Sequence, residues 1–391
     1  MIYRLFFRLV LQRIDEERAH ALALRGLKLA TGLPVLRQLL RRTLTPRDPR
    51  LEVRALGLTF PSPLVVAAGV DKDATGFESL GIIGFGAVEV GTVTAEPQAG
   101  NRRPRVYRLQ RDRALLNRMG FPNPGAQVVA ERLRGREGHT VIGANVGKTA
   151  TVPIEDATAD YCASVRRLAP LCDYLVLNVS SPNTPGLTTM QAEEPLRRLV
   201  SAVRHELRAS CPGLPTLLKI GPDLSDEEID TIADLALELE VDGIIAINTT
   251  VGRSYLAHSA EEAASYGEGG VSGAPLKDRG LTVLKRLRAR AGENLVLVSV
   301  GGIETPADAW ERIRAGATLV QAYTPFVYGG PLWPGRINRG LARLVRDAGG
   351  TSIEQFIGTG VSTAVGDGPH STKNTVLERG PGEVQLAPTV R

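Results

Sequence analysis

Residues 64–72, with the sequence LVVAAGVDK, join an apolar run to a polar end, and this combination decides the fold. The run is continuous rather than alternating, which is typical of a strand buried on both faces of a parallel sheet. Seven more short runs rich in valine, isoleucine and leucine follow along the chain, so the sequence predicts eight strands. Their centres lie near Val66, Val88, Ile142, Val176, Leu218, Ile245, Val298 and Val320.

Helical patterns separate several of these runs. Residues 225–228 (SDEE) form a capping box that opens one helix, and Thr305-Pro306 supplies an N-cap and an N1 proline for another. Eight strand–helix units over roughly residues 64–345 match the α/β fold called the (β/α)8 TIM barrel, whose typical size is about 250 residues. An open, doubly wound sheet is the alternative, although no GxGxxG motif follows the first strand. Residues 51–60 predict a hairpin ahead of the barrel.

The ends of the predicted strands indicate a single site, because the active site of a TIM barrel forms at the carboxyl ends of its strands. Each run ends in small, polar or hydrogen-bonding residues. Only seven of the 47 Lys and Arg residues are lysines, yet Lys72, Lys148 and Lys219 all lie at strand ends. A compact ammonium group does different chemistry from a planar guanidinium, so lysine is favoured there for a reason; chance placement on solvated loops is the alternative.

Composition narrows the kind of site. The three cysteines and five scattered histidines show no metal-ligand spacing, so we predict no metal. Residues 1–42 carry nine Lys or Arg against three acidic residues, a net charge of +6, and the whole chain has +5, so the remainder is close to neutral. No basic stripe with interleaved aromatic residues runs through that remainder, so nucleic acid is not an expected partner.

The first 42 residues predict a helical hairpin. Apolar residues between 2 and 10 fall on one helical stripe, Asp15 caps a second helix through about Ala30, and residues 32–34 (GLP) mark a turn. Arginines interrupt the apolar runs, so no segment approaches the roughly 20 apolar residues that span a bilayer. A basic amphipathic hairpin suits the surface of an anionic membrane, and simple packing on the main domain is the alternative.

The predicted pocket has groups that suit a flavin. Gly301-Gly302 and the segment after the last strand lie where barrels commonly hold phosphate. Asparagines at three strand ends offer paired donors and acceptors for a flat heterocycle. These features point to FMN beside a planar substrate. Two other classes remain open from the residues alone: a Schiff-base aldolase with Lys219 as its nucleophile, and a non-catalytic scaffold on the membrane surface.

The motifs at these positions resemble those of one family, the dihydroorotate dehydrogenases of the second, quinone-linked and membrane-associated class. The resemblance runs from the N-terminal helices to about residue 360. It implies an FMN enzyme that oxidises dihydroorotate to orotate in pyrimidine (UMP) biosynthesis and passes the electrons to a membrane quinone. The motifs occur in family order as AAGVDK (67–72), GTVT (91–94), NRMGF (117–121), NVGK (145–148), NVSSPNTPGL (178–187), KIGPDLS (219–225), INTT (247–250), SVGGI (299–303) and AYTPF (322–326).

The resemblance also implies the roles of individual residues. Ser181 would be the base that removes the C5 proton of the substrate while hydride leaves C6. The quinone would lie near His20, Arg108 and Tyr323. The substrate would contact Lys72, Asn117, Arg118, Met119, Gly120, Phe121, Asn178, Asn183, Asn248 and Thr249. FMN would contact Ala68, Gly69, Val70, Asp71, Lys72, Thr92, Asn145, Asn178, Lys219, Ile247, Gly273, Gly302, Tyr323 and Thr324.

Two features favour the quinone-linked class over the soluble class, which carries cysteine as its base. Ser181 occupies the base position with no cysteine in its loop, and the N-terminal helices are present. Ile247 departs from the family, which often has threonine beside the flavin. The expected domains are a helical hairpin with the quinone tunnel (1–45), the FMN barrel (46–361) and a disordered tail (362–391). Residues 1–42 would contact the cell membrane peripherally from its cytoplasmic side.

Overall fold

Eight parallel strands form a closed barrel in the computed structural model, which describes residues 2–138, 140–254, 256–257 and 260–360. The last barrel strand pairs with the first through Val320 and Leu64, which closes the sheet. All eight predicted centres fall inside these strands, so the predicted (β/α)8 barrel is confirmed. The strands are β3 (Leu64–Asp71), β4 (Ala87–Val93), β7 (Val141–Val146), β8 (Tyr174–Asn178), β9 (Thr216–Ile220), β10 (Gly243–Ala246), β12 (Val296–Val300) and β13 (Leu319–Ala322).

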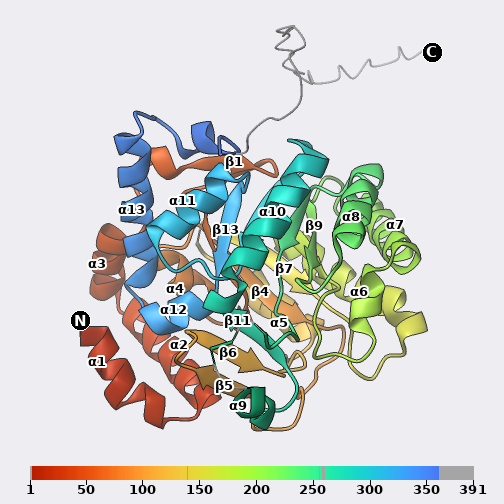
Figure 1. The fold of residues 1–391 in the computed structure, drawn as a ribbon, viewed down its shortest axis with the longest axis horizontal. Coiled ribbons are helices and arrows are strands. Elements are labelled where there is room, and N and C mark those ends of the chain that lie inside the picture. Colours follow the sequence, from red (N-terminus) through yellow and green to blue (C-terminus); the bar gives the residue numbers. More distant parts are fainter. Residues whose placement is uncertain (1, 139, 255, 258–259, 361–391) are drawn as a thin grey trace, which may run out of the picture. The chain divides into compact units, whose positions relative to one another are not determined.

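Helices surround the barrel and bury their apolar faces against it (Figure 1). Both predicted caps are present: Ser225 accepts from the N–H of Glu228, and Thr305 accepts from the N–H of Asp308. Each cap satisfies a donor that the first helical turn leaves free. The helices are α4 (Phe77–Ile82), α5 (Ala126–Arg134), α6 (Ala157–Leu168), α7 (Glu193–Ser210), α8 (Asp226–Glu238), α10 (Lys277–Ala291), α11 (Pro306–Arg314) and α13 (Trp333–Asp347).

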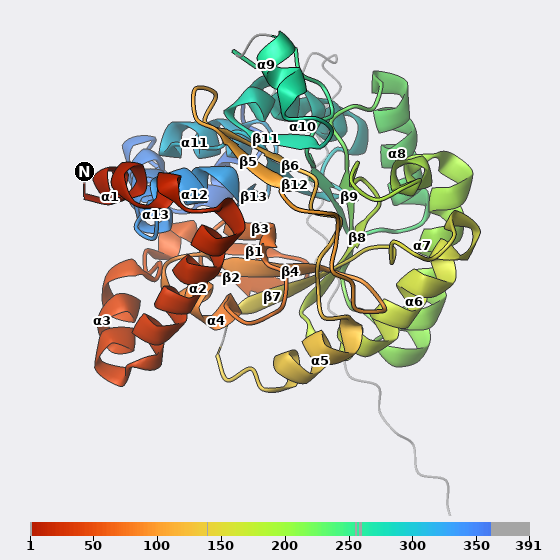
Figure 2. The same ribbon diagram turned by 90° about the horizontal axis from the view of Figure 1, so that it is seen from below.

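Three N-terminal helices, α1 (Ile2–Leu9), α2 (Glu16–Gly32) and α3 (Pro34–Leu44), lie together on one side of the barrel (Figure 2). The Tyr3 hydroxyl donates to a carbonyl of the short helix α12 (Thr324–Gly329), and Thr31 hydrogen-bonds with Ser79 of α4. The helices therefore pack on the barrel, yet large apolar side chains stay exposed on them. Among these are Leu22, Leu29, Leu33, Val35 and Leu39.

No helix in the described ranges is long and apolar enough to cross a membrane. The predicted hairpin ahead of the barrel is present as β1 (Val53–Ala55) and β2 (Leu58–Phe60), which pair antiparallel. The predicted tail of residues 362–391 lies outside the described residues.

A small antiparallel sheet stands outside the barrel and was not predicted. Its strands β5 (Val106–Leu109) and β6 (Ala114–Asn117) come from the insertion after β4, and β11 (Gly270–Gly273) comes from the insertion after β10. The order is β11–β6–β5, and the short helix α9 (Ala260–Ser265) lies nearby (Figure 1). An apolar cluster separate from the barrel core includes the buried side chains of Leu109, Leu116 and Val271. Their packing holds the two insertions together.

Candidate active site

The carboxyl ends of the barrel strands surround one cavity. The β5–β6–β11 sheet borders it through Val106, Leu115 and Gly273. The predicted site residues that line it are Ala68, Gly69, Lys72, Thr92, Asn117, Met119, Gly120, Phe121, Asn178, Ser181, Asn183, Lys219, Ile247, Asn248, Thr249, Gly273, Gly302, Tyr323 and Thr324.

Two predicted cofactor contacts on β3, Val70 and Asp71, are not among the lining residues. The Val70 carbonyl accepts from Nε2 of His20 at 2.8 Å. The Asp71 carboxylate accepts from the backbone N–H groups of Thr75 and Gly76, each at 2.8 Å. Both groups therefore fix the chain around the site, one by tying α2 to β3 and the other by capping the turn after β3.

Asn145 lies behind the cavity lining rather than in it. Its Oδ1 accepts from the Thr92 hydroxyl at 2.6 Å, and the same hydroxyl accepts from Nδ2 of Asn178 at 2.9 Å. Thr92 and Asn178 both line the cavity, so Asn145 reaches a ligand only through them.

Arg118 and Lys148 are likewise not among the lining residues, and both donate to backbone carbonyls. The Arg118 guanidinium donates to the carbonyls of Tyr266 and Glu268, at 2.7 and 2.8 Å, and so joins the two insertions that form the outer sheet. The Lys148 ammonium donates to the carbonyls of Thr149 and Val152. The expectation that three strand-end lysines meet at one ligand is therefore wrong for Lys148, whose bonds fix its own loop.

A buried carboxylate, missed from the sequence, lies beneath the cavity. Glu89 of β4 is 0% exposed, and its oxygens accept from Asn145 at 2.7 Å and from Gln321 at 2.5 Å. Its third partner is the Lys219 ammonium at 3.4 Å. Gln321 and Lys219 line the cavity, so Glu89 fixes two ligand-facing side chains. An acidic residue inside the apolar run AVEVGTV was the available signal, because a buried carboxylate is costly unless it is paired.

The segment after β8 presents Ser181 to the cavity at 5% exposure. Its hydroxyl oxygen accepts from the backbone N–H of Asn183 at 3.3 Å, and the Asn183 amide donates to Oδ1 of Asn117 at 3.3 Å. Thr184, three residues after Ser181, has a buried hydroxyl with no hydrogen-bond partner among the described residues. A buried hydroxyl of this kind is expected to bind a water or a ligand group.

Lys72 brings a positive charge to the part of the cavity that it lines. Its ammonium donates to the Gly69 carbonyl at 2.5 Å. Desolvation lowers the pKa of Lys72, while the carboxylates of Asp73 and Glu17 act in the opposite direction. A ligand carboxylate placed beside the ammonium would offset the lost solvation, so this part of the cavity suits an anionic substrate.

Two glycines of the lining give the cavity the backbone shape that a phosphate needs. Gly273 and Gly302 have φ angles of +106° and +71°. A Cβ at Gly273 would lie 2.4 Å from the Arg113 carbonyl oxygen, and one at Gly302 would lie 2.7 Å from Cα of Lys277. Only glycine fits at these two positions, and their bare backbone leaves N–H groups accessible. The residues present therefore fit a cofactor that carries a phosphate.

The three residues predicted for the quinone come from three elements: His20 from α2, Arg108 from β5, and Tyr323 from the segment between β13 and α12. Burial, and secondarily the Lys72 charge, lowers the pKa of His20 to about 4, so its ring is neutral and donates to the Val70 carbonyl. Arg108 donates to the Ile14 carbonyl at 3.0 Å. Tyr323 lines the main cavity, and burial raises the pKa of its hydroxyl to about 12. Of the three, Tyr323 alone reaches the cavity lining.

A barrel mouth with these residues fits an FMN-dependent oxidoreductase. The family model described as dihydroorotate dehydrogenase matches residues 50–345. The chain belongs to the dihydroorotate dehydrogenase family, in its quinone-dependent class, whose members are FMN flavoproteins. This assignment excludes the aldolase and scaffold alternatives.

Several relatives are similar over nearly their whole length. The dihydroorotate dehydrogenase (quinone) of Thermobifida fusca is 57% identical over 92% of this chain and 97% of its own. That of Rhodococcus opacus is 53% identical over 92% and 99%. The crystal structure of DHODH from Eimeria tenella in complex with ferulenol has a TM-score of 0.79 and 37% identity, and covers 88% of this chain and 95% of that one.

Proposed function

We propose that the protein oxidises (S)-dihydroorotate to orotate, with FMN as hydride acceptor and a membrane quinone as final electron acceptor, in the de novo synthesis of UMP. The observation that carries this proposal is the convergence of Ser181, Lys72 and the asparagine amides on one cavity, in a chain of this family. The relatives named above support the choice of quinone as the acceptor.

The chain's own residues supply binding and proton removal. The Lys72 ammonium pairs with the substrate carboxylate, and the amides of Asn117, Asn183 and Asn248 match the donors and acceptors of the pyrimidine ring. Ser181 takes the proton from C5 while hydride leaves C6, so that a C5–C6 double bond forms. Bound FMN supplies the two-electron acceptor for that hydride.

Ser181 can act as a base only if it passes its proton onward. A free hydroxyl holds its proton far above neutral pH, so the loop must exclude bulk water and pass the proton onward. Ser181 is nearly fully buried, and the unpartnered Thr184 hydroxyl on the same loop is a candidate group for the onward path.

The anaerobic half-reaction tests this proposal. Dihydroorotate should bleach the flavin absorbance of the unsubstituted protein. The Ser181→Ala variant should still hold FMN and bind orotate, but its rate of flavin reduction should be lower by about 10²-fold or more. Thr189→Ala, which removes an exposed hydroxyl near the end of the same loop, is the matched control and should behave like the unsubstituted protein. Undiminished flavin reduction in Ser181→Ala would remove the base assignment.

We further propose that residues 1–45 form the membrane- and quinone-binding element, and that residues 46–361 form the FMN barrel. The exposed leucines and valine of α2 and α3 stand among arginines, a pattern suited to the interface of an anionic membrane. Such peripheral contact would place the protein on the cytoplasmic side of the cell membrane. Retention in the supernatant after centrifugation with anionic vesicles would contradict it.

The position of His20, Arg108 and Tyr323 supports a quinone path between these helices and the barrel. Tyr323 borders the cavity, and His20 is linked to Val70 at the adjoining end of β3. A quinone that enters beside α2 would thus approach the cavity at the wall that Tyr323 forms. Substitution of His20 should therefore alter quinone turnover while sparing reduction by dihydroorotate, and equal quinone turnover would contradict this path.

A further inference from the structure

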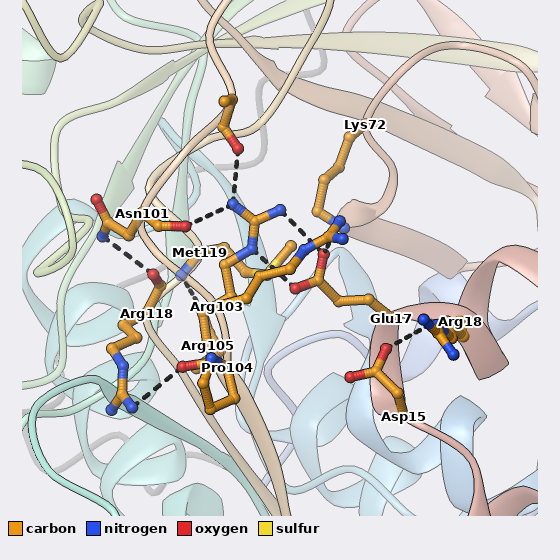
Figure 3. A network of polar contacts seen from close by, with 12 residues as sticks. Asp15, Glu17, Arg18, Lys72, Asn101, Arg103, Pro104, Arg105, Arg118 and Met119 are labelled. Carbon is orange, nitrogen blue, oxygen red and sulfur yellow. Dashed lines mark hydrogen bonds and ion pairs between the residues drawn. The ribbon is translucent and has the colours of Figure 1, made fainter.

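A carboxylate of the N-terminal helices reaches toward the site from outside the barrel. Glu17 of α2 pairs with Arg103 and Arg105, which precede β5 (Figure 3). Arg105 donates from Nε and Nη2 to the two oxygens of Glu17, at 2.8 and 2.9 Å. The Arg105 side chain is 5% exposed and that of Glu17 is 18% exposed. This bidentate pair is largely shielded from water, where charge-assisted bonds are strong.

The other end of the Arg105 guanidinium shapes the loop before it. Nη1 donates to the carbonyls of Ala99 and Asn101, at 2.6 and 2.9 Å. Gly100 lies between them at a φ of +75°, and a Cβ there would come within 2.7 Å of Nη1. The loop therefore wraps closely around the guanidinium, so the place of Asn101 depends on where Glu17 holds Arg105.

Asn101 connects this loop to the segment that carries Ser181. Its side-chain amide donates to the Asn183 carbonyl at 3.2 Å and to the Arg118 carbonyl at 3.0 Å. Asn183 is the residue whose backbone N–H donates to the Ser181 hydroxyl. Direct contacts thus run without a break from α2 to the proposed base, over the path Glu17–Arg105–Asn101–Asn183.

We propose that Glu17 is a positioning residue for the substrate side of the site: through Arg105 and Asn101 it holds Asn183, and with it Ser181, in place. This inference rests on the proposed function and adds a mechanical link between the quinone-side helix and the loop of the base. Glu17 does not line the cavity, so it acts through these contacts. The link matters because a displacement of about 1 Å at a reacting group can cost on the order of 10²-fold in rate.

The first test compares Glu17→Gln with Glu16→Gln in the full-length, FMN-loaded protein. Glutamine keeps the shape of Glu17 and removes the charge that holds Arg105. Glu16 is the neighbouring carboxylate and pairs with Arg108 instead, so it is the matched control. We expect Glu17→Gln to slow anaerobic flavin reduction about tenfold and to weaken orotate binding, with Glu16→Gln unchanged. Equal rates in Glu17→Gln and the unsubstituted protein would overturn the proposal.

A double-mutant cycle with Asn101→Ala tests the route. Asn101 is exposed, and its replacement removes the bond to Asn183 without disturbing the Glu17–Arg105 pair. In the Asn101→Ala background, Glu17→Gln should have little further effect, because both changes break one path. Fully additive effects would show that Glu17 acts by another route, such as its charge on Lys72, and would refute the proposal.

Hydrogen–deuterium exchange gives a readout that does not depend on turnover. Peptides spanning residues 178–187 should exchange several-fold faster in Glu17→Gln and Asn101→Ala than in Glu16→Gln. Unchanged exchange in that segment would also refute the positioning role. If the unsubstituted protein does not reduce its flavin with dihydroorotate, the proposed function fails by itself, and exchange still decides whether Glu17 holds the loop.

Discussion

Replacing Glu89 with glutamine should remove a charge from the barrel interior with little change of shape. The Lys219 ammonium is 3.4 Å from the Glu89 carboxylate, and the two side chains are 6% and 0% exposed. At an effective dielectric constant of about 20, opposite charges at this distance attract by about 5 kcal/mol. Breaking a buried pair from one side typically costs about 3–5 kcal/mol, so we expect a loss of that order.

The neutral hydrogen bonds should survive this substitution, so the loss should report on charge alone. Gln321 donates to Glu89 through its amide nitrogen, while its amide oxygen is buried and has no partner among the described residues. In Glu89→Gln the Gln321 amide can turn over and accept from the new side-chain nitrogen. Asn145 can still donate to the remaining oxygen of residue 89.

Urea unfolding followed by tryptophan fluorescence, at one fixed excess of FMN, measures the effect. Glu238→Gln is the control, because Glu238 pairs with Arg197 on an exposed surface and its loss should leave the midpoint unchanged. In a Lys219→Met background, Glu89→Gln should cost much less, since no buried cation is left without a partner. A Glu89→Gln midpoint equal to that of the control would refute the view that Glu89 offsets the charge of Lys219.

Two further predictions concern the N-terminal helices. Burial and the Lys72 charge hold the pKa of His20 near 4, below its ordinary 6.5, so the unfolded chain takes up a proton that the fold does not. Acidification from pH 7 to pH 5 should therefore destabilise the unsubstituted protein by about 2 kcal/mol more than His20→Gln; the same pH dependence in both would contradict this. Replacement of Leu29 and Val35, 74% and 83% exposed, by aspartate should weaken binding to anionic vesicles by at least about tenfold. Ile154→Asp, on the barrel, should leave vesicle binding unchanged, and equal binding by all three proteins would contradict a role for α2 and α3.

The barrel could be predicted because its strands follow a simple local rule. A strand buried on both faces is mostly apolar, and residues 64–66 or 174–177 show this directly. Capping boxes such as Ser225–Glu228 also lie within one turn of sequence. The outer sheet could not be predicted in this way, because β6 pairs with β11 across more than 150 residues, as Asn117 does with Gly270.

Most predicted site residues line the cavity, whereas the residues that support the lining were harder to find from the sequence. Asn145 and Asp71 both belong to family motifs. Asn145, however, bonds to Thr92, and Asp71 bonds to the backbone of the turn that follows it. Glu89 and Arg105 hold other side chains and loops in place, and their partners, such as Gln321 for Glu89 and Glu17 for Arg105, are distant in sequence. No spacing pattern marks such pairs, so folding had to bring them together before their roles could be seen.

The β5–β6–β11 sheet has a consequence for how this enzyme could be redesigned. The two insertions that form this sheet pair with each other, so they make one hydrogen-bonded unit that is separate from the barrel sheet. Replacing both insertions together with those of another family member would keep that pairing. Replacing only one would leave the strand of the other without its matching partner. A library that varies the pair as a single module, with Gly273 kept, could therefore alter which ring the enzyme accepts while leaving the flavin-facing residues intact.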